Sequence, residues 1–195
     1  MKKQENQNIK TVNIKVVKSD VSSDKSKSLY KKIERKISKG KGVANDIKEL
    51  NEKYSIQKFE ATNKLPMDGR KLIPLAWDNQ ETNLFVNYAA VGTDSTAATD
   101  SDTQLGSEIF RRQIASHTIG TSSDADKFYP TAFFGATDFS GTVEEVGLFI
   151  QGTSSANSGY LFSRFSSSDT AELPVTKSST ETLSCEYTIT TTSSN

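Results

Sequence analysis

Short apolar or alternating runs, separated by clusters of Gly, Ser, Thr, Asp and Asn, occupy the chain from Leu72 almost to its end. Runs of about four to eight residues between turn-forming residues are typical of β-strands, and a series at this spacing favours an antiparallel sandwich or jelly roll. We therefore predict a mainly-β fold. The predicted strands cover residues 72–77, 84–91, 108–119, 128–134, 142–150, 160–165 and 182–191, with a short one at 173–177.

The last of these strands has the clearest alternation. Leu183, Cys185, Tyr187 and Ile189 share one face, and polar residues occupy the other. The period of two predicts that the apolar face is core. Cys185, the single cysteine, is then a buried and unreactive thiol, and the fold cannot depend on an intramolecular disulfide.

The charge of the chain is divided into two halves that cancel. Residues 1–64 hold 17 Lys+Arg and 8 Asp+Glu, a balance of +9, whereas residues 65–195 hold 7 and 16, a balance of −9. Such asymmetry indicates parts with different roles. We predict two domains: a basic N-terminal arm with two short α-helices over residues 1–60, and an antiparallel β-sandwich or jelly-roll-like domain over residues 65–195.

The N-terminal part has one strand pattern and two helical patterns. Apolar residues alternate within residues 10–18, and this strand is expected to pair either with the main sheet or with another chain. Stripes at helical spacing follow on both sides of Gly40 and Gly42, and helices this short need a partner surface. We expect these segments to attach the subunit to its particle, and the predicted docking residues are Val12, Ile14, Val16, Leu29, Ile33, Ile37, Ile47 and Leu50.

The sequence does not indicate an enzyme. His117 is the only histidine, which excludes multi-histidine metal sites, and the chain has no phosphate-binding glycine motif and no CxxC pair. We expect no cofactor and no catalytic residues. Acidic loops leave a calcium site open as an alternative to simple solvation, because Ca²⁺ prefers several carboxylate oxygens. The residues concerned are Asp94, Asp100, Asp102, Asp124 and Asp126.

Other partners can be ranked from the charge pattern. The basic residues encircle the first predicted helix and the second helix is acidic, so the pattern favours docking on protein over binding of nucleic acid. The chain has neither an apolar run long enough to span a membrane nor a secretory signal. A sugar-recognition site, the main alternative, needs aromatic platforms, and these would have to lie on a sheet face around Trp77, Tyr129 or Tyr160 because the loops carry none.

Residues 68–191 also contain an ordered series of landmarks, which covers about two thirds of the chain. They are Asp68-Gly69-Arg70, YAAVGTDSTAATDSDTQLGSEIFRR (88–112), GTVEEVGLFI (141–150), ANSGYLFSRF (156–165), Pro174-Val175-Thr176-Lys177 and ETLSCEYTITTT (181–192). The series resembles a group of small structural proteins of tailed bacteriophages and prophages, usually described as tail-fibre or minor virion proteins. In that group a VGTG…D..L..E..R stretch precedes an EVGLF strand, an LFAR strand and a final K…L.V.W.I strand.

The resemblance implies a non-enzymatic virion structural protein, made in the host cytoplasm and assembled with copies of itself and with other virion proteins. Its place in the particle stays open among tail fibre, tail tip, connector and capsid-associated component. The alternative is a carbohydrate-binding or host-recognition module whose partner is a host-surface glycan. The few arginines of the acidic domain are expected to pair within the subunit: Arg111, Arg112 and Arg164 with Glu108, Glu144 or Glu145.

Overall fold

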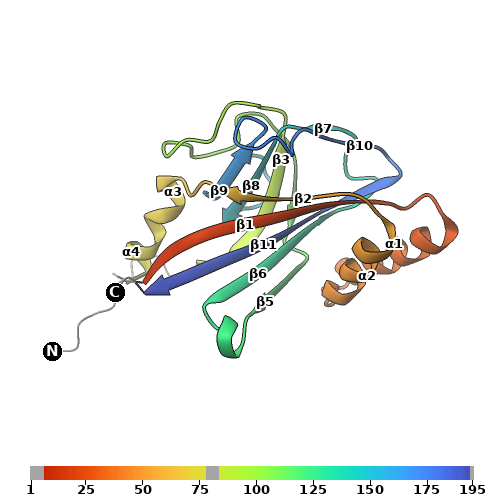
Figure 1. The fold of residues 1–195 in the computed structure, drawn as a ribbon, viewed down its shortest axis with the longest axis horizontal. Helices are drawn as coiled ribbons and strands as arrows, with labels where there is room; N and C mark the ends of the chain where they lie inside the picture. The colour runs from red at the N-terminus through yellow and green to blue at the C-terminus, as the bar shows by residue number, and fades with distance from the viewer. Residues whose placement is uncertain (1–6, 78–83, 194–195) are drawn as a thin grey trace.

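Two antiparallel sheets pack face to face in the computed structural model, which describes residues 7–77 and 84–193 (Figure 1). The predicted mainly-β sandwich is thus confirmed. The larger sheet has the order β2 (Ser55–Asn63), β1 (Gln7–Asp20), β11 (Glu181–Ser193), β6 (Lys127–Phe134) and β5 (Ser116–Ile119). The smaller sheet has the order β4 (Glu108–Gln113), β3 (Val86–Gly92), β8 (Glu145–Ile150) and β9 (Tyr160–Ser166). A short pair joins β7 (Gly141–Val143) to β10 (Val175–Lys177).

The main core lies between the two sheets. From the larger sheet, β11 contributes Leu183, Cys185 and Tyr187, each no more than 1% exposed. From the smaller sheet, residues such as Val146 and Leu148 of β8 are fully buried in the same cluster. The alternation predicted for the last strand is therefore confirmed, and so is the burial of the Cys185 thiol. Burial raises the pKa of that thiol far above its usual range.

Strand β1 is central to the larger sheet, which corrects the division into an arm and a β domain. It pairs with β11 along its whole length, from Gln7 opposite Ser193 to Asp20 opposite Glu181, and with β2 on its other side. The inward side chains of β1, Val12 among them, are at most 1% exposed and belong to the main core. Residues 7–63 are thus part of the sandwich, and the predicted docking residues of β1 have no free surface.

Strand β2 was not predicted and closes one side of the sandwich. Phe59 and Ala61 point inward and alternate with polar residues, but the pattern directly follows a helix and has no turn signal before it. Beyond β2, the backbone N–H and C=O groups of Lys64 bond those of Arg164 in β9, with N to O distances of 3.0 and 3.1 Å. The chain thereby passes from one sheet to the other.

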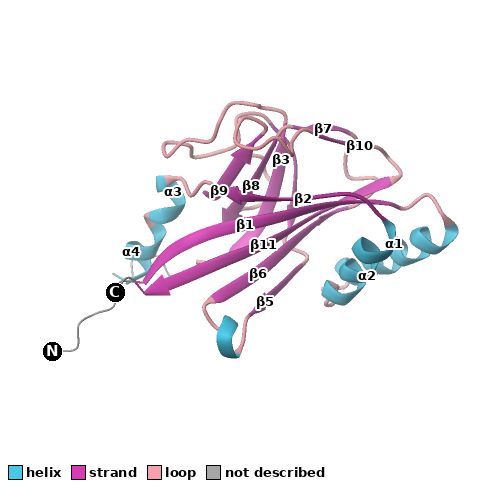
Figure 2. Cartoon of the chain, in the orientation of Figure 1, coloured by secondary structure: helices cyan, strands magenta, loops and turns pink. Residues whose placement is uncertain are grey.

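Helices α1 (Asp24–Ile37) and α2 (Ala44–Tyr54) cover one end of the outer face of the larger sheet (Figure 2). The Ser23 hydroxyl caps α1 by accepting a hydrogen bond from the N–H of Ser26, and Gly40 takes a positive φ of 60° in the turn that follows. The two helices and their apolar stripes confirm the sequence prediction of helical structure.

These stripes pack on the chain's own sheet. Ile33, Ile47 and Leu50 are no more than 2% exposed, and they form a second core with Phe133 of β6. Leu29 and Ile37 are partly buried against the same cluster. The helical docking residues predicted from the sequence are therefore used inside the subunit, because the sheet supplies the partner surface that such short helices need.

Two further strand predictions need correction. Residues 72–77 form a short helix, α4 (Leu72–Trp77), after the one-turn helix α3 (Met67–Arg70), because a short apolar run fits a helix as well as a strand. Residues 108–119 divide into β4 and β5, since the chain crosses from one sheet to the other between them. In Figure 1, α3 and α4 lie at the opposite end of the molecule from α1 and α2.

Candidate functional site

A buried arginine organises the long acidic loop 93–107. Arg164 of β9 is only 3% exposed, and its Nε donates to Oε2 of Glu145, which is fully buried, at 2.9 Å. Its other nitrogens donate to Asp102 at 2.7 Å and to Asp94 at 3.2 Å. A fourth bond of 3.2 Å reaches the carbonyl oxygen of Thr96. One guanidinium thus holds four points of the protein together.

Glu145 completes this cluster from the loop side. Its carboxylate accepts the backbone N–H groups of Gly106 at 3.0 Å and Ser107 at 2.7 Å. Gly92 permits the approach, since a Cβ there would stand 2.3 Å from the same carboxylate. The buried negative charge therefore has an arginine and several amide donors, as a stable buried ion pair requires.

The two aspartates of this cluster have pKa values below their usual range. For Asp94 the main cause is the pair of hydrogen bonds from Thr96, to which the Arg164 guanidinium adds. For Asp102, burial alone would raise the pKa, but bonds from Thr99 and from Arg164 outweigh it. Both carboxyls are therefore charged at neutral pH and already face a cation.

A second arginine holds the hairpin connection 151–159. Arg111 and Glu108 form two hydrogen bonds of 2.6 and 2.8 Å, and both side chains are nearly buried. The Nη1 of Arg111 also donates to the carbonyl oxygens of Thr153 and Ser158, at 3.1 and 2.9 Å. Its guanidinium carbon lies 4.6 Å from the centre of the Phe149 ring.

Arg112 and the buried Lys177 connect further segments of the subunit. Arg112 bridges Glu34 of α1 and Asp138 of a neighbouring loop, which ties the helix to the sandwich. Lys177, 1% exposed, donates to the carbonyl oxygens of Ala136 at 3.0 Å and Phe139 at 2.7 Å. Burial lowers the pKa of Lys177. The expected pairing within the subunit is confirmed for Arg111 with Glu108 and for Arg164 with Glu145. The partners expected for Arg112 were wrong, because it pairs with Glu34 and Asp138.

The acidic loops are thus built around cations of the chain itself. Asp100 pairs with Arg70 at 2.9 Å, and Asp124 pairs with Lys127 at 2.5 Å. Within residues 7–77 and 84–193, no three His, Cys, Asp or Glu side chains gather as metal ligands would. His117 is exposed and lies beside Phe128 at the edge strand β5.

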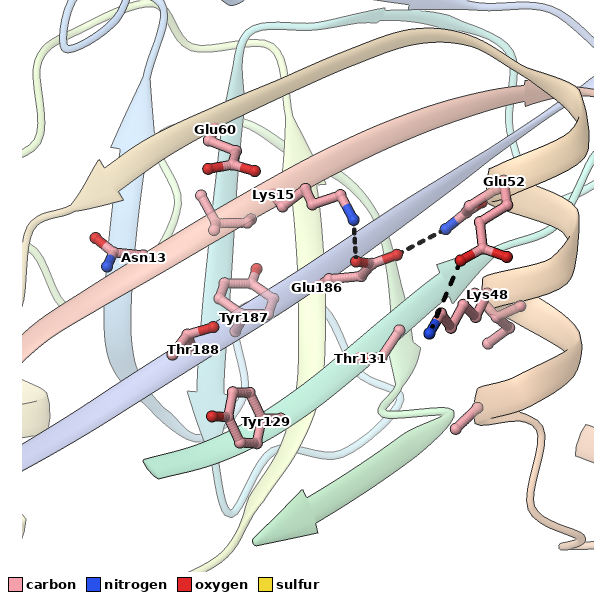
Figure 3. Close-up of a pocket in the computed structure, with 14 residues that line it drawn as sticks. Asn13, Lys15, Lys48, Glu52, Glu60, Tyr129, Thr131, Glu186, Tyr187 and Thr188 are labelled. Atoms are coloured by element: carbon pink, nitrogen blue, oxygen red, sulfur yellow. Dashed lines mark hydrogen bonds and ion pairs between the residues drawn. The ribbon is translucent and has the colours of Figure 1, made fainter. Parts of the chain in front are cut away.

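A groove of about 450 Å³ lies on the part of the larger sheet's outer face next to α2 (Figure 3). Polar side chains from four strands form its floor, and α2 contributes Lys48 and Glu52 to its wall. Tyr129 of β6 lies at the far side of the groove from these two residues. Tyr129, one of the aromatic residues considered for sugar recognition, therefore lines this groove.

Tyr160, another of the aromatic residues considered, lies away from this groove. The ring of Tyr160 in β9 stands under the ammonium group of Lys71, 5.2 Å from its centre. The side chain of Trp77 is outside the described part of the structure. A second groove, of about 500 Å³, is mainly apolar and runs between the sheets near β5, with the exposed side chains of Phe85 and Ile119 at its rim.

Comparison with protein-family models, with curated proteins and with solved structures found no match to this chain. None of the helices in the described residues has the length and apolar character needed to cross a membrane.

Proposed function

We propose that this protein is a non-enzymatic structural component of the virion of a tailed bacteriophage, in the tail, the connector or the capsid-associated layer. In this proposal it is made in the host cytoplasm and assembles with copies of itself and with other virion proteins. Its loops are held by internal ion pairs, so that the sandwich presents fixed surfaces to its neighbours.

The observation that carries the proposal is where the landmark residues lie. Glu108 and Arg111 of the first long landmark pair with each other, and Glu145 of the EVGLF strand pairs with Arg164 of the SRF strand. These four charged landmark residues thus hold the loops 93–107 and 151–159 to the smaller sheet. A sequence signature made of scaffold residues is what a shared structural role requires, whereas an enzyme family would keep groups that meet a substrate.

Apolar landmark residues support the same reading. Leu105, fully buried, contacts the backbone of β8 at Gly147, where an added Cβ would stand 2.8 Å from the leucine Cδ2. The Leu105 side chain can therefore pack at this position because residue 147 is a glycine and has no side chain of its own. Together with the ion pairs, this contact fixes the long acidic loop on strand β8.

Attachment to neighbours then needs surface that the fold leaves exposed. Helix α1 offers such a surface. Among its cations, only Lys32 and Lys36 pair with Asp46, at 2.7 and 2.5 Å. Besides Lys32, which is also exposed, the exposed cations on this helix and in the turn after it are Lys25, Lys27, Lys31, Arg35, Lys39 and Lys41. In our proposal this face attracts residues 65–195 of another copy, whose net charge is −9. Salt limits that attraction to about 8 Å at physiological ionic strength.

Quantitative mass spectrometry of purified particles tests the proposal. We expect peptides of this chain in particles of a phage or prophage that encodes it, at a fixed copy number relative to the major capsid protein. Absence from particles, together with accumulation of the free protein in infected or induced cells, would contradict a virion role. Particles stripped of loosely bound protein by a high-salt wash serve as the control for contamination.

A further inference from the structure

The outer face of the larger sheet is divided into a covered end and an open end. Under α1 and α2, outward residues such as Val17 and Ser19 of β1 are at most 1% exposed. Beyond the helices, the same face carries Asn13 and Lys15 on β1, and Glu186 and Thr188 on β11. These side chains and the wall of α2 form the groove of Figure 3.

The floor of this groove is an ordered row across four strands. Lys15 is opposite Glu60 of β2 on one side and opposite Glu186 of β11 on the other. Glu186 is in turn opposite Thr131 of β6. Three strand spacings give the row a length of about 14 Å, enough for a short oligosaccharide or a similar extended polar ligand.

The central carboxylate of the row is fixed before any ligand arrives. Glu186 accepts a hydrogen bond of 2.8 Å from the ammonium group of Lys15 and another of 2.8 Å from the amide of Asn51 in α2. The Asn51 carbonyl oxygen is itself held by the hydroxyls of Ser19 and Ser184, at 3.1 and 3.3 Å. Such preorganised polar groups lose little conformational entropy on binding.

An aromatic ring stands at one end of this row. Tyr129 is half-buried on β6, two residues before Thr131 and on the same face. A tyrosine in this position offers an apolar ring face together with a hydroxyl group, the combination that an amphipathic ring such as a pyranose needs. The groove thus joins a stacking surface to fixed hydrogen-bonding groups, which is the general composition of small-ligand sites.

The charges of the groove select among saccharides. Lys15 pairs with Glu186, and Lys48 with Glu52 at 3.8 Å, so each positive charge is matched inside the groove. Glu60, which is exposed, adds a further negative charge. An anionic sugar would therefore meet net repulsion.

We propose that this groove is a binding site for a neutral oligosaccharide, with Tyr129 as the stacking residue and with Lys15, Glu186 and Asn13 as hydrogen-bonding residues. This inference is independent of the virion role, because it rests on the groove alone. It goes beyond an assembly function, since a subunit that only packs needs no site of this kind.

Titration of the full-length protein with defined trisaccharides tests the inference. The probes are maltotriose, cellotriose and tri-N-acetylchitotriose as neutral sugars, and 3′-sialyllactose as the anionic one, with binding followed by amide chemical shifts in NMR spectra. We expect a neutral trisaccharide at millimolar concentration to shift amide signals of β1, β11 and β6 around the groove, and we expect 3′-sialyllactose to shift none. Failure of all three neutral sugars to bind would overturn the proposal.

Variants of two aromatic residues give the matched comparison. Tyr129→Ala should weaken binding of the neutral sugar about tenfold, the loss expected for one aromatic stacking contact, whereas Tyr129→Phe should retain most of the affinity. Phe85→Ala removes an exposed aromatic side chain at the other groove and should leave the affinity unchanged. Equal affinity of the Tyr129→Ala and wild-type proteins, with both folded by circular dichroism, would place the sugar elsewhere and refute the assignment.

Discussion

Replacement of Arg164 by Met tests whether the buried ion cluster supports the fold. Methionine fills a similar volume but removes the positive charge and four hydrogen bonds, to Glu145, Asp102, Asp94 and the Thr96 carbonyl. The variant leaves the carboxylate of Glu145, which is fully buried, without its charge partner. Loss of one partner from a buried ion pair costs about 3–5 kcal/mol.

The lower end of that range is expected here. Glu145 keeps the backbone N–H donors of Gly106 and Ser107, which continue to compensate part of its charge. A loss of about 3 kcal/mol corresponds to a fall in Tm of roughly 6–12 °C for a domain of this size. Chemical denaturation in urea, followed by circular dichroism, measures the free energy of unfolding, and limited proteolysis reports whether the loop 93–107 is released.

A surface pair provides the matched control. Arg70→Met breaks the ion pair between Arg70, whose side chain is 46% exposed, and Asp100, whose side chain is 62% exposed. The loss of this surface pair should cost less than about 1 kcal/mol. Equal stability of the two variants would refute the structural role of the cluster. The pH dependence has a definite sign, because the pKa values of Asp94 and Asp102 lie below the ordinary 3.8 in the folded protein. Their contribution is present above that value and is lost as the pH falls below it, so the difference between wild type and Arg164→Met should narrow in acid.

Three further outcomes are expected. A chain of residues 65–195 alone should give no cooperative melt, because β11 would lose its neighbour β1 and the main core would lose the inward side chains of β1 and β2. A native-like melt would show that these strands are dispensable. Cys185, fully buried, should react with a thiol reagent only as fast as the protein unfolds, and rapid labelling of the native protein would contradict its place in the core. Ile33→Asp should destabilise the subunit itself by more than about 4 kcal/mol by burying a charge, whereas Lys31→Asp on the exposed side of α1 should stay folded; equal urea midpoints would show that α1 does not pack as described.

The strands that read clearly from the sequence are those with one strongly apolar face. In β11 the alternation from Leu183 to Ile189 predicted both the strand and the buried thiol. The apolar run of α4 was assigned to a strand, because six residues without a clear period fit either structure. Strand β2 was missed because its alternation begins where helix α2 ends.

The N-terminal half shows what charge can and cannot predict. Its excess of lysine indicated a separate arm, but most of those cations whose side chains the structure describes lie on exposed surface, and net charge says little about which strands pair. The apolar residues of β1 and of the helices decide the packing, and they lie in the subunit's own cores. The pattern identified these residues correctly as apolar faces, although it could not say which surface covers them.

The groove next to α2 was beyond prediction for a similar reason. Lys15, Asn51 and Glu186 are far apart in the sequence, and only the register of β1 against β11 and the packing of α2 bring them together. Tyr129 could be named in advance as a candidate platform, because aromatic residues on a strand face are visible in the alternation. Its polar neighbours required the tertiary structure.

A three-dimensional reconstruction of the particle that encodes this protein tests the central claim most directly. We expect density into which the whole sandwich fits, with β1 between β2 and β11, repeated at a fixed number of symmetry-related positions in the tail, the connector or the capsid-associated layer. The cationic face of α1 should lie against a neighbouring subunit. A complete particle in which no density accommodates this sandwich would contradict the proposed role.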